Sequence, residues 1–268
     1  MRPQSVRTAY LLASAAVAAV LALSAAGCKT TGDDTTGSIG NPGAQQSDTD
    51  ARRSLDTLSA RYQANPGDAE AAMAYAKVLR ANEQRAQAVA VLQQASIRNP
   101  NNMTLLGAYG RALADAGEYA EALDALGRAH TPDNPDWRIL NAQGAVLDQM
   151  GRHDEAQRHY SAALKIVPNE PSVLSNLGLS YLLQKNLKRA EFTLRKAVGQ
   201  ANASPRVRQN LALVIGLEGR YAEAEKIASA DLPPSEAAAN VTYLRQMLSQ
   251  QDDLKKGGPP YVPPDPGS

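Results

Sequence analysis

Cysteine, histidine and aromatic residues are scarce in this chain of 268 residues, which has one Cys, one Trp, one Phe and three His, with aromatic residues at 4%. The single cysteine, Cys28, excludes a disulfide within the chain. His153 and His159 lie six residues apart, not the four that places metal ligands on the same face of a helix. We therefore predict no metal site, and interpret His130, His153 and His159 as solvated turn and helix residues.

An excess of either positive or negative charge is also lacking. The 28 basic and 27 acidic residues leave a formal net charge of +1 and are spread along the chain, so the basic footprint of a nucleic-acid-binding protein is missing. The sequence has no Gly-rich phosphate loop, no Cys and His pair and no nucleophile elbow. We predict a protein that is not an enzyme, needs no cofactor and does not take nucleic acid as its main ligand.

The N-terminus has the pattern of a signal peptide. Arg2 and Arg7 precede an apolar run from Ala9 to about Ala26 that ends in small residues before Cys28. A retained anchor helix is the alternative, but this run is short and mostly Ala and Ser, whereas a membrane-spanning helix needs about 20 predominantly apolar residues. We predict that residues 1–27 are removed.

The residues Ala25-Ala26-Gly27-Cys28 resemble the bacterial lipobox, with Ala25 where that motif usually has Leu. The resemblance implies that Cys28 carries diacylglycerol and becomes an acylated N-terminus, and several acyl chains would anchor it firmly. Lys29 follows, not the Asp that signals inner-membrane retention in enteric-type lipoproteins. The resemblance therefore implies an outer-membrane lipoprotein with its folded part in the periplasm. Residues 28–50 have too few apolar side chains to order, so we expect a flexible tether.

Small residues recur with a period of 34, which is the main signal in the sequence. One series is Ala88, Ala122, Ala156, Ala190 and Ala224, and a second, twelve residues earlier, is Ala76, Gly110, Gly144, Gly178 and Ala212. Large residues stand between them, among them Leu92, Leu126, Tyr160 and Leu194. Small side chains at a helix crossing let two antiparallel helices approach closely, and Gly117, Gly151 and Gly219 fall where the turns within the pairs are expected.

With this spacing the chain resembles the tetratricopeptide repeat family over residues 69–231, as five repeats. The resemblance implies an all-α fold, a right-handed superhelical solenoid of helix-turn-helix repeats. We predict the helix of a leading half-repeat within residues 51–68, and a helix at residues 235–250 that caps the end of the stack. We expect the Pro-rich tail, 251–268, to be disordered.

In this family the first helix of each repeat lines a concave groove that holds a protein or peptide. The resemblance assigns to that groove Lys77, Arg80, Arg111, Arg138, Asn141, Asn176, Leu179, Arg206, Asn210 and Leu213, and also Asp148. By the same resemblance Asn176 and Asn210 hydrogen-bond the main chain of an extended peptide, since an amide offers both a donor and an acceptor. The alternatives stay open: the asparagines could brace neighbouring helices, and the basic residues could be solvated surface charges.

The likeness to the carboxylate clamp of chaperone-binding relatives is partial, because Asn141 and Ala145 stand where the clamp has Lys and Asn. Recognition of a C-terminal carboxylate is therefore not inferred. Leu179, Leu182 and Leu213 add an apolar strip that suits a helix or a hydrophobic peptide.

Over its whole length, including the closing stretch 237–247, the chain resembles the TadD family of lipoproteins of the tight-adherence (Flp) pilus system. This resemblance implies a scaffold for assembly of the pilus secretion apparatus, with the secretin or other pilus subunits as partners. A general envelope adaptor for peptidoglycan enzymes or outer-membrane assembly machinery, and a purely structural lipoprotein, are the alternatives.

Overall fold

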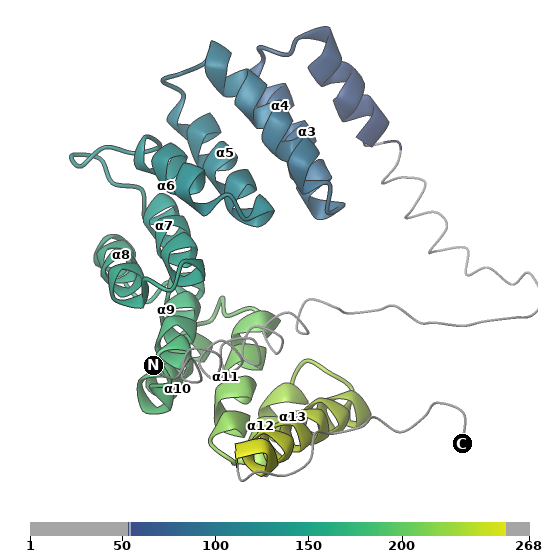
Figure 1. The fold of residues 1–268 in the computed structure, drawn as a ribbon, viewed down its shortest axis with the longest axis vertical. Helices are drawn as coiled ribbons and strands as arrows, with labels where there is room; N and C mark the ends of the chain where they lie inside the picture. The colour runs from purple at the N-terminus through teal and green to yellow at the C-terminus, as the bar shows by residue number, and fades with distance from the viewer. Residues whose placement is uncertain (1–52, 54, 256–268) are drawn as a thin grey trace, which may run out of the picture. The chain divides into compact units, whose positions relative to one another are not determined.

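The computed structural model describes residues 53 and 55–255, and the predicted signal peptide, Cys28, the tether and residues 256–268 lie outside this part. The described residues are helical apart from turns and an isolated β-bridge between Thr131 and Asn134. A helix at residues 55–64 comes first. It is followed by α3 (Ala69–Ala81), α4 (Arg85–Arg98), α5 (Met103–Ala116), α6 (Tyr119–Gly127), α7 (Trp137–Gln149), α8 (His153–Ile166), α9 (Pro171–Leu183), α10 (Leu187–Val198), α11 (Pro205–Leu217), α12 (Tyr221–Ala228) and α13 (Pro234–Lys255) (Figure 1).

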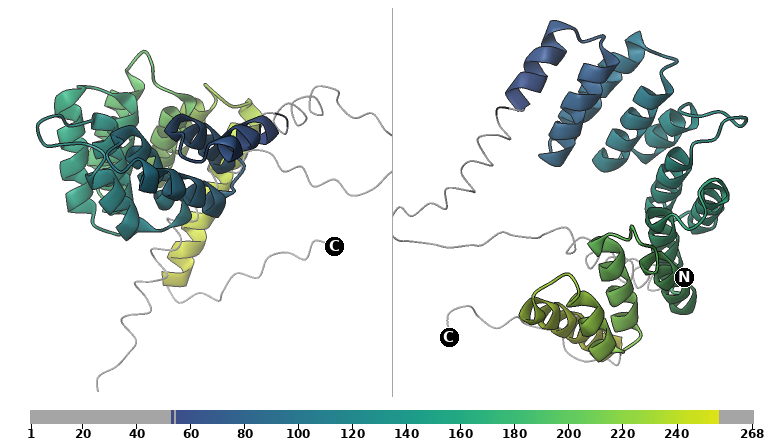
Figure 2. Two further views of the ribbon diagram at one scale, coloured as in Figure 1. Left: turned by 90° about the horizontal axis from the view of Figure 1, so that it is seen from above. Right: turned by 180° about the vertical axis from the view of Figure 1, so that it is seen from behind.

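The helices from α3 to α12 form five consecutive pairs. Each second helix packs against the first helix of its own pair and against the first helix of the next pair. First helices also contact one another in the series α3, α5, α7, α9 and α11, whereas second helices have no comparable series of contacts among the described residues. The pairs follow one another as a stack in Figure 1 and in the right-hand view of Figure 2. The predicted all-α solenoid of helix-turn-helix repeats is confirmed.

In the second, third and fourth pairs, close approach of the two helices depends on glycine in the first helix. A Cβ atom on Gly144 would lie 2.5 Å from Cε1 of Tyr160, and one on Gly178 would lie 2.6 Å from Cγ of Leu194. Tyr160 is 1% exposed, so its ring has no room to move away. The predicted pairing of small residues in α7 and α9 with large ones in α8 and α10 is therefore confirmed, and it brings the two backbones together.

The turns within the pairs share one backbone conformation. Gly117, Gly151 and Gly219 have φ of 84°, 74° and 81°, in the left-handed region that glycine adopts without strain. The residues at the same phase of the first and fourth repeats are Glu83 and Lys185, and their φ values are 59° and 62°. The chain therefore keeps the left-handed turn where it lacks the glycine, at a conformational cost to those two residues.

The helix at residues 55–64 packs on the first pair as an extra second helix would. Tyr62 is buried, with its ring centroid 5.7 Å from that of Tyr75, and its hydroxyl donates a hydrogen bond to Oε1 of Gln94 at 2.6 Å. In this way the apolar side of α3 is covered before the first complete repeat begins.

The opposite end of the stack is covered by α13, which packs against α11 and α12. Leu244 fills the space in front of Gly216, where a Cβ would lie 2.5 Å from Cδ2 of the leucine. The helix extends to Lys255, five residues beyond the predicted end at 250, so residues 251–255 are helical and not part of a disordered tail. None of the helices in the described part of the chain is long and apolar enough to cross a membrane.

Candidate functional site

The ten residues predicted to line a groove all lie on the first helices of the repeats. Lys77 and Arg80 are on α3, Arg111 on α5, Arg138 and Asn141 on α7, Asn176 and Leu179 on α9, and Arg206, Asn210 and Leu213 on α11. Because these five helices contact one another in series, they present the residues along one continuous row. The packing therefore places these side chains on successive helices, with Lys77 in the first repeat and Leu213 in the last.

The cations in this row differ in how far they are already paired. Lys77, Arg138 and Arg206 are exposed, and the guanidinium of Arg138 lies 4.5 Å from the ring centroid of Trp137. Arg80 instead donates a hydrogen bond from Nε to Oδ2 of Asp115, on the next first helix. Arg80 therefore links two repeats, whereas the exposed cations have no such bond within the described residues.

Arg111 is half-buried and has no hydrogen bond or ion pair within the described part of the chain. Burial lowers the pKa of its guanidinium, and the charge of Arg80 lowers it further. Asp136 and Asp115 act in the opposite direction on this pKa, but neither forms an ion pair with Arg111. Arg111 is thus a partly desolvated cation that lacks a direct counter-charge.

Amide side chains link the later repeats. Asn176 donates a hydrogen bond from Nδ2 to Oδ1 of Asn141 at 3.0 Å, and Asn210 donates one from Nδ2 to Oγ of Ser175 at 2.9 Å. Each bond joins residues 35 positions apart, which connects one first helix to the next. The bracing role left open by the sequence is therefore present. The Oδ1 atoms of Asn176 and Asn210 accept no hydrogen bond from any described residue, and their contact with a peptide stays a prediction.

The apolar strip lies on the same row. Leu182 is 4% exposed and belongs to the core of the fourth and fifth repeats. Leu179 and Leu213 pack against that core but remain half-buried. Of the three predicted leucines, Leu179 and Leu213 therefore keep an accessible apolar surface, and Leu182 is part of the packing.

Asp148 does not line the groove, so that part of the prediction is wrong. Its side chain is buried, and its Oδ2 accepts a hydrogen bond from the hydroxyl of Tyr160 at 2.9 Å. Its Oδ1 accepts one from Oγ of Ser180 and lies 2.8 Å from Nδ1 of His153. A carboxylate with three polar partners can be buried, since each partner replaces water. Asp148 therefore joins α7, α8 and α9 from inside.

The interpretation of the histidines as solvated residues is also wrong. His153 contacts Asp148 with a side chain that is 23% exposed. The Nδ1 atoms of His130 and His159 are buried without a hydrogen-bond partner. Burial lowers the pKa of His159, and the charge of His130 lowers it further. Among the described residues, no group of three or more His, Cys, Asp and Glu side chains is placed to hold a metal ion.

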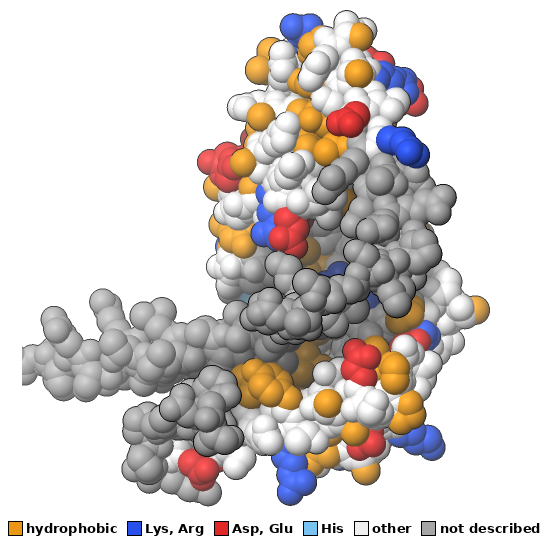
Figure 3. All heavy atoms as spheres, turned by 90° about the vertical axis from the view of Figure 1, so that its right-hand side faces the viewer, with side chains coloured by type: hydrophobic (Ala, Val, Ile, Leu, Met, Phe, Trp, Pro, Cys, Tyr) orange, Lys and Arg blue, Asp and Glu red, His pale blue; other side chains and the backbone are white. Residues whose placement is uncertain are grey.

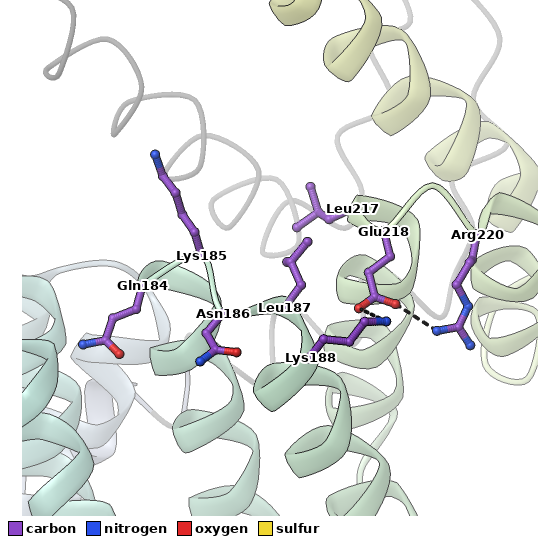
Figure 4. A pocket seen from close by; sticks show the side chains of 8 residues that line it. All are labelled: Gln184, Lys185, Asn186, Leu187, Lys188, Leu217, Glu218 and Arg220. Carbon is purple, nitrogen blue, oxygen red and sulfur yellow. Dashed lines mark hydrogen bonds and ion pairs between the residues drawn. The ribbon is translucent and has the colours of Figure 1, made fainter.

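A hollow of about 810 Å³ lies between the turns that join α9 to α10 and α11 to α12 (Figure 4). Glu218 lines this hollow, and its Oε1 lies 3.3 Å from Nζ of Lys188 and its Oε2 2.8 Å from Nη1 of Arg220. The remaining lining residues are Gln184, Lys185, Asn186, Leu187 and Leu217. Among the charged residues that line it, Lys188, Glu218 and Arg220 are paired with one another, and none of the ten predicted groove residues lines the hollow.

Charged side chains are scattered over the face shown in Figure 3. Acidic and basic groups lie there among hydrophobic and uncharged ones. This distribution agrees with the near balance of basic and acidic residues in the sequence. Local recognition by individual side chains, rather than one extended field of a single sign, is what such a surface supports.

Two family profiles match the chain. Residues 55–129 match the profile described as anaphase-promoting complex, cyclosome, subunit 3, and residues 149–214 match a tetratricopeptide repeat profile. A search of curated protein sequences found no match.

Solved structures share the fold at low sequence identity. PilW, described as a widely conserved type IV pilus biogenesis factor, is 18% identical, with a TM-score of 0.62 over 74% of this chain and 93% of PilW. The Cut9–Hcn1 hetero-tetramer of the anaphase-promoting complex is 16% identical, with a TM-score of 0.61 over 75% of this chain and 40% of the matched chain. A human IFIT1 dimer with m7Gppp-AAAA is 16% identical, with a TM-score of 0.58 over 78% of this chain and 52% of IFIT1.

Proposed function

We propose that this chain holds another polypeptide along its row of first helices, since residues 149–214 match a tetratricopeptide repeat profile and such repeats generally provide scaffolds for protein partners. We propose further that it does so as an outer-membrane lipoprotein in assembly of the Flp (tight-adherence) pilus secretion apparatus, with the secretin as the main partner.

The observation that carries the proposal is that the row has hydrogen-bond acceptors and apolar surface that no described residue uses. Asn176 and Asn210 each use one N–H to brace a neighbouring helix and leave a carbonyl oxygen without a donor among the described residues, and of the two only Asn176 is half-buried, since Asn210 is 7% exposed. Leu179 and Leu213 are half-buried beside them. An extended polypeptide offers main-chain N–H groups and apolar side chains at regular intervals, so it matches both needs.

The place in pilus assembly is supported by the resemblance to the TadD family and by the likeness in fold to PilW, whose description is that of a pilus biogenesis factor. The membrane anchor is supported by the lipobox-like residues that end in Cys28, with Lys29 after them. With an acylated N-terminus and a tether, the repeats could meet a partner in the periplasm at some distance from the bilayer.

A site-specific photocrosslinker in living cells tests the contact. Placed at Arg138, which is exposed on α7, it should produce a crosslink to the secretin. The matched control is Ile97, which is 74% exposed on the second helix α4 and should give no such product. Crosslinks from Arg138 to peptidoglycan enzymes or outer-membrane assembly proteins would replace the pilus assignment with a general envelope adaptor. The absence of any Arg138 crosslink would contradict groove binding and favour a purely structural lipoprotein.

A separate experiment tests the anchor. Cys28→Ser should prevent acylation, and the protein should move from the membrane to the soluble fraction of the envelope and change in electrophoretic mobility. Unchanged processing and fractionation would contradict the lipoprotein assignment while leaving the crosslinking result intact.

A further inference from the structure

The row of first helices changes character along its length. One position per repeat, spaced by 34 residues, is occupied by Lys77, Arg111, Ala145, Leu179 and Leu213. It is cationic in the first two repeats, small in the third and apolar in the last two. Because the same position recurs on helices that contact one another in series, the change is a gradient across one surface.

The cationic end contains the unmatched charge. Arg111 is half-buried and lacks a direct counter-charge within the described residues. The carboxylate of Asp115, on the same helix, already accepts a hydrogen bond from Arg80. A guanidinium that is partly removed from water gains more from an incoming carboxylate than an exposed one does, because part of its desolvation has already taken place.

Resting on the function proposed above, we propose that the bound polypeptide is an extended segment with an acidic side chain at one end and an apolar side chain at the other. The acidic group pairs with Arg111, and the apolar group covers Leu179, with Leu213 on the next first helix beyond it. The Oδ1 atom of the half-buried Asn176 accepts a main-chain N–H group in the apolar part.

The spacing follows from helix packing. Adjacent packed helices lie about 8–10 Å apart, and Leu179 is two first helices beyond Arg111, so the two sites are separated by roughly 16–20 Å. An extended chain advances about 3.3 Å per residue, so the acidic and apolar side chains should stand about five or six residues apart.

Selection from a random 12-residue peptide display library, on the full-length protein in detergent, tests this pattern. Peptides that bind the unaltered protein should be enriched in Asp or Glu at about five or six residues from Leu, Ile or Phe. Arg111→Gln should abolish the acidic enrichment and keep the apolar one, and Leu179→Asn with Leu213→Asn should do the reverse. The matched control is Arg85→Gln, which removes the same charge from an exposed position at the start of α4.

The most enriched peptide then gives the strength of the contact by fluorescence anisotropy. Arg111→Gln should weaken its binding about 10- to 100-fold, and replacing the peptide's acidic residue by its amide should weaken binding to the unaltered protein but not to Arg111→Gln. Arg111→Lys, which keeps the charge, should retain the acidic preference, and it serves as the second variant if Arg111→Gln fails to show normal helical melting.

The outcomes separate the two proposals. Enrichment of peptides without an acidic position, or an identical selection by Arg111→Gln, would overturn the charge pairing and leave peptide binding intact. Failure of the unaltered protein to select any peptide would contradict the proposed function itself.

Discussion

Tyr160 and the buried Asp148 offer a direct test of how the third and fourth repeats are joined. Tyr160→Phe keeps the ring packed against Gly144 and removes the hydroxyl that donates to Oδ2 of Asp148 at 2.9 Å. Burial, reinforced by the charge of Asp148, raises the pKa of Tyr160 far above its usual range, so the hydroxyl remains protonated and donates at neutral pH. Asp148 is 8% exposed, which limits the water that could replace the lost donor.

The expected cost is that of a hydrogen bond to a charged group, about 1.5–3 kcal/mol of the free energy of unfolding. Urea denaturation followed by circular dichroism measures it, and amide hydrogen exchange in α7, α8 and α9 shows whether the loss is local. Tyr62→Phe is the matched control, since it removes a hydroxyl that donates to the neutral Oε1 of Gln94 and should cost about 0.5–1.5 kcal/mol.

A second step distinguishes the loss of a donor from a general packing defect. In the Tyr160→Phe background, Asp148→Leu with Ser180→Ala removes the carboxylate and its other hydroxyl partner. Leu182, at the same phase one repeat later, is 4% exposed, so leucine is tolerated at this position of the fold. Stability should recover, because the buried carboxylate that lost its tyrosine donor is gone, and His153, whose side chain is 23% exposed, can hydrogen-bond to water instead. The reasoning is refuted if Tyr160→Phe costs no more than Tyr62→Phe, or if the combined variant is less stable than Tyr160→Phe alone.

Two further predictions concern the turns and the histidines. Lys185→Gly should stabilise the protein by roughly 0.5–1 kcal/mol in urea denaturation, because Lys185 has a left-handed φ that glycine adopts without strain. Gly117→Ala should destabilise it by about 1 kcal/mol for the same reason. Opposite signs would contradict the idea that a left-handed φ strains these turns. The pKa of His159 is lowered in the folded state, so the unfolded chain takes up a proton first and stability should fall as the pH drops below about 6.5. His159→Gln should reduce the difference between urea midpoints at pH 7.5 and pH 5.5, and an unchanged difference would argue against its role.

The repeat architecture was predictable because its physical cause is local and periodic. Gly110, Gly144 and Gly178 are each followed sixteen residues later by a large side chain, and that interval brings two antiparallel helices into register. The turn glycines were predictable for the same reason. Glu83 and Lys185 adopt the same conformation without glycine, and the sequence predicted no left-handed residue there because the stack, not the local residue, imposes that φ.

The errors fall where exposure depends on one particular neighbour. Asp148 stands at a repeat position that predicted exposure on the groove side, and its burial requires a tyrosine at 160 and a serine at 180. His159 has a buried Nδ1, and the charge of His130 acts on its pKa; the two residues are 29 positions apart, an interval that the 34-residue period does not specify. Which of the accessible groove residues bind a partner cannot be read from the period either, because the period fixes position and not occupancy.

The position of α13 limits how this array could lengthen in evolution. Leu244 fills the space in front of Gly216 that a sixth repeat would need for its own first helix, and Ala237 packs with Ala212 and Ala228. A duplicated unit added after α12 would have to displace the terminal helix, whereas one inserted between two existing pairs would meet surfaces that already fit. Related proteins with more repeats should therefore have gained them between existing pairs, and they should keep alanines where the final helix packs.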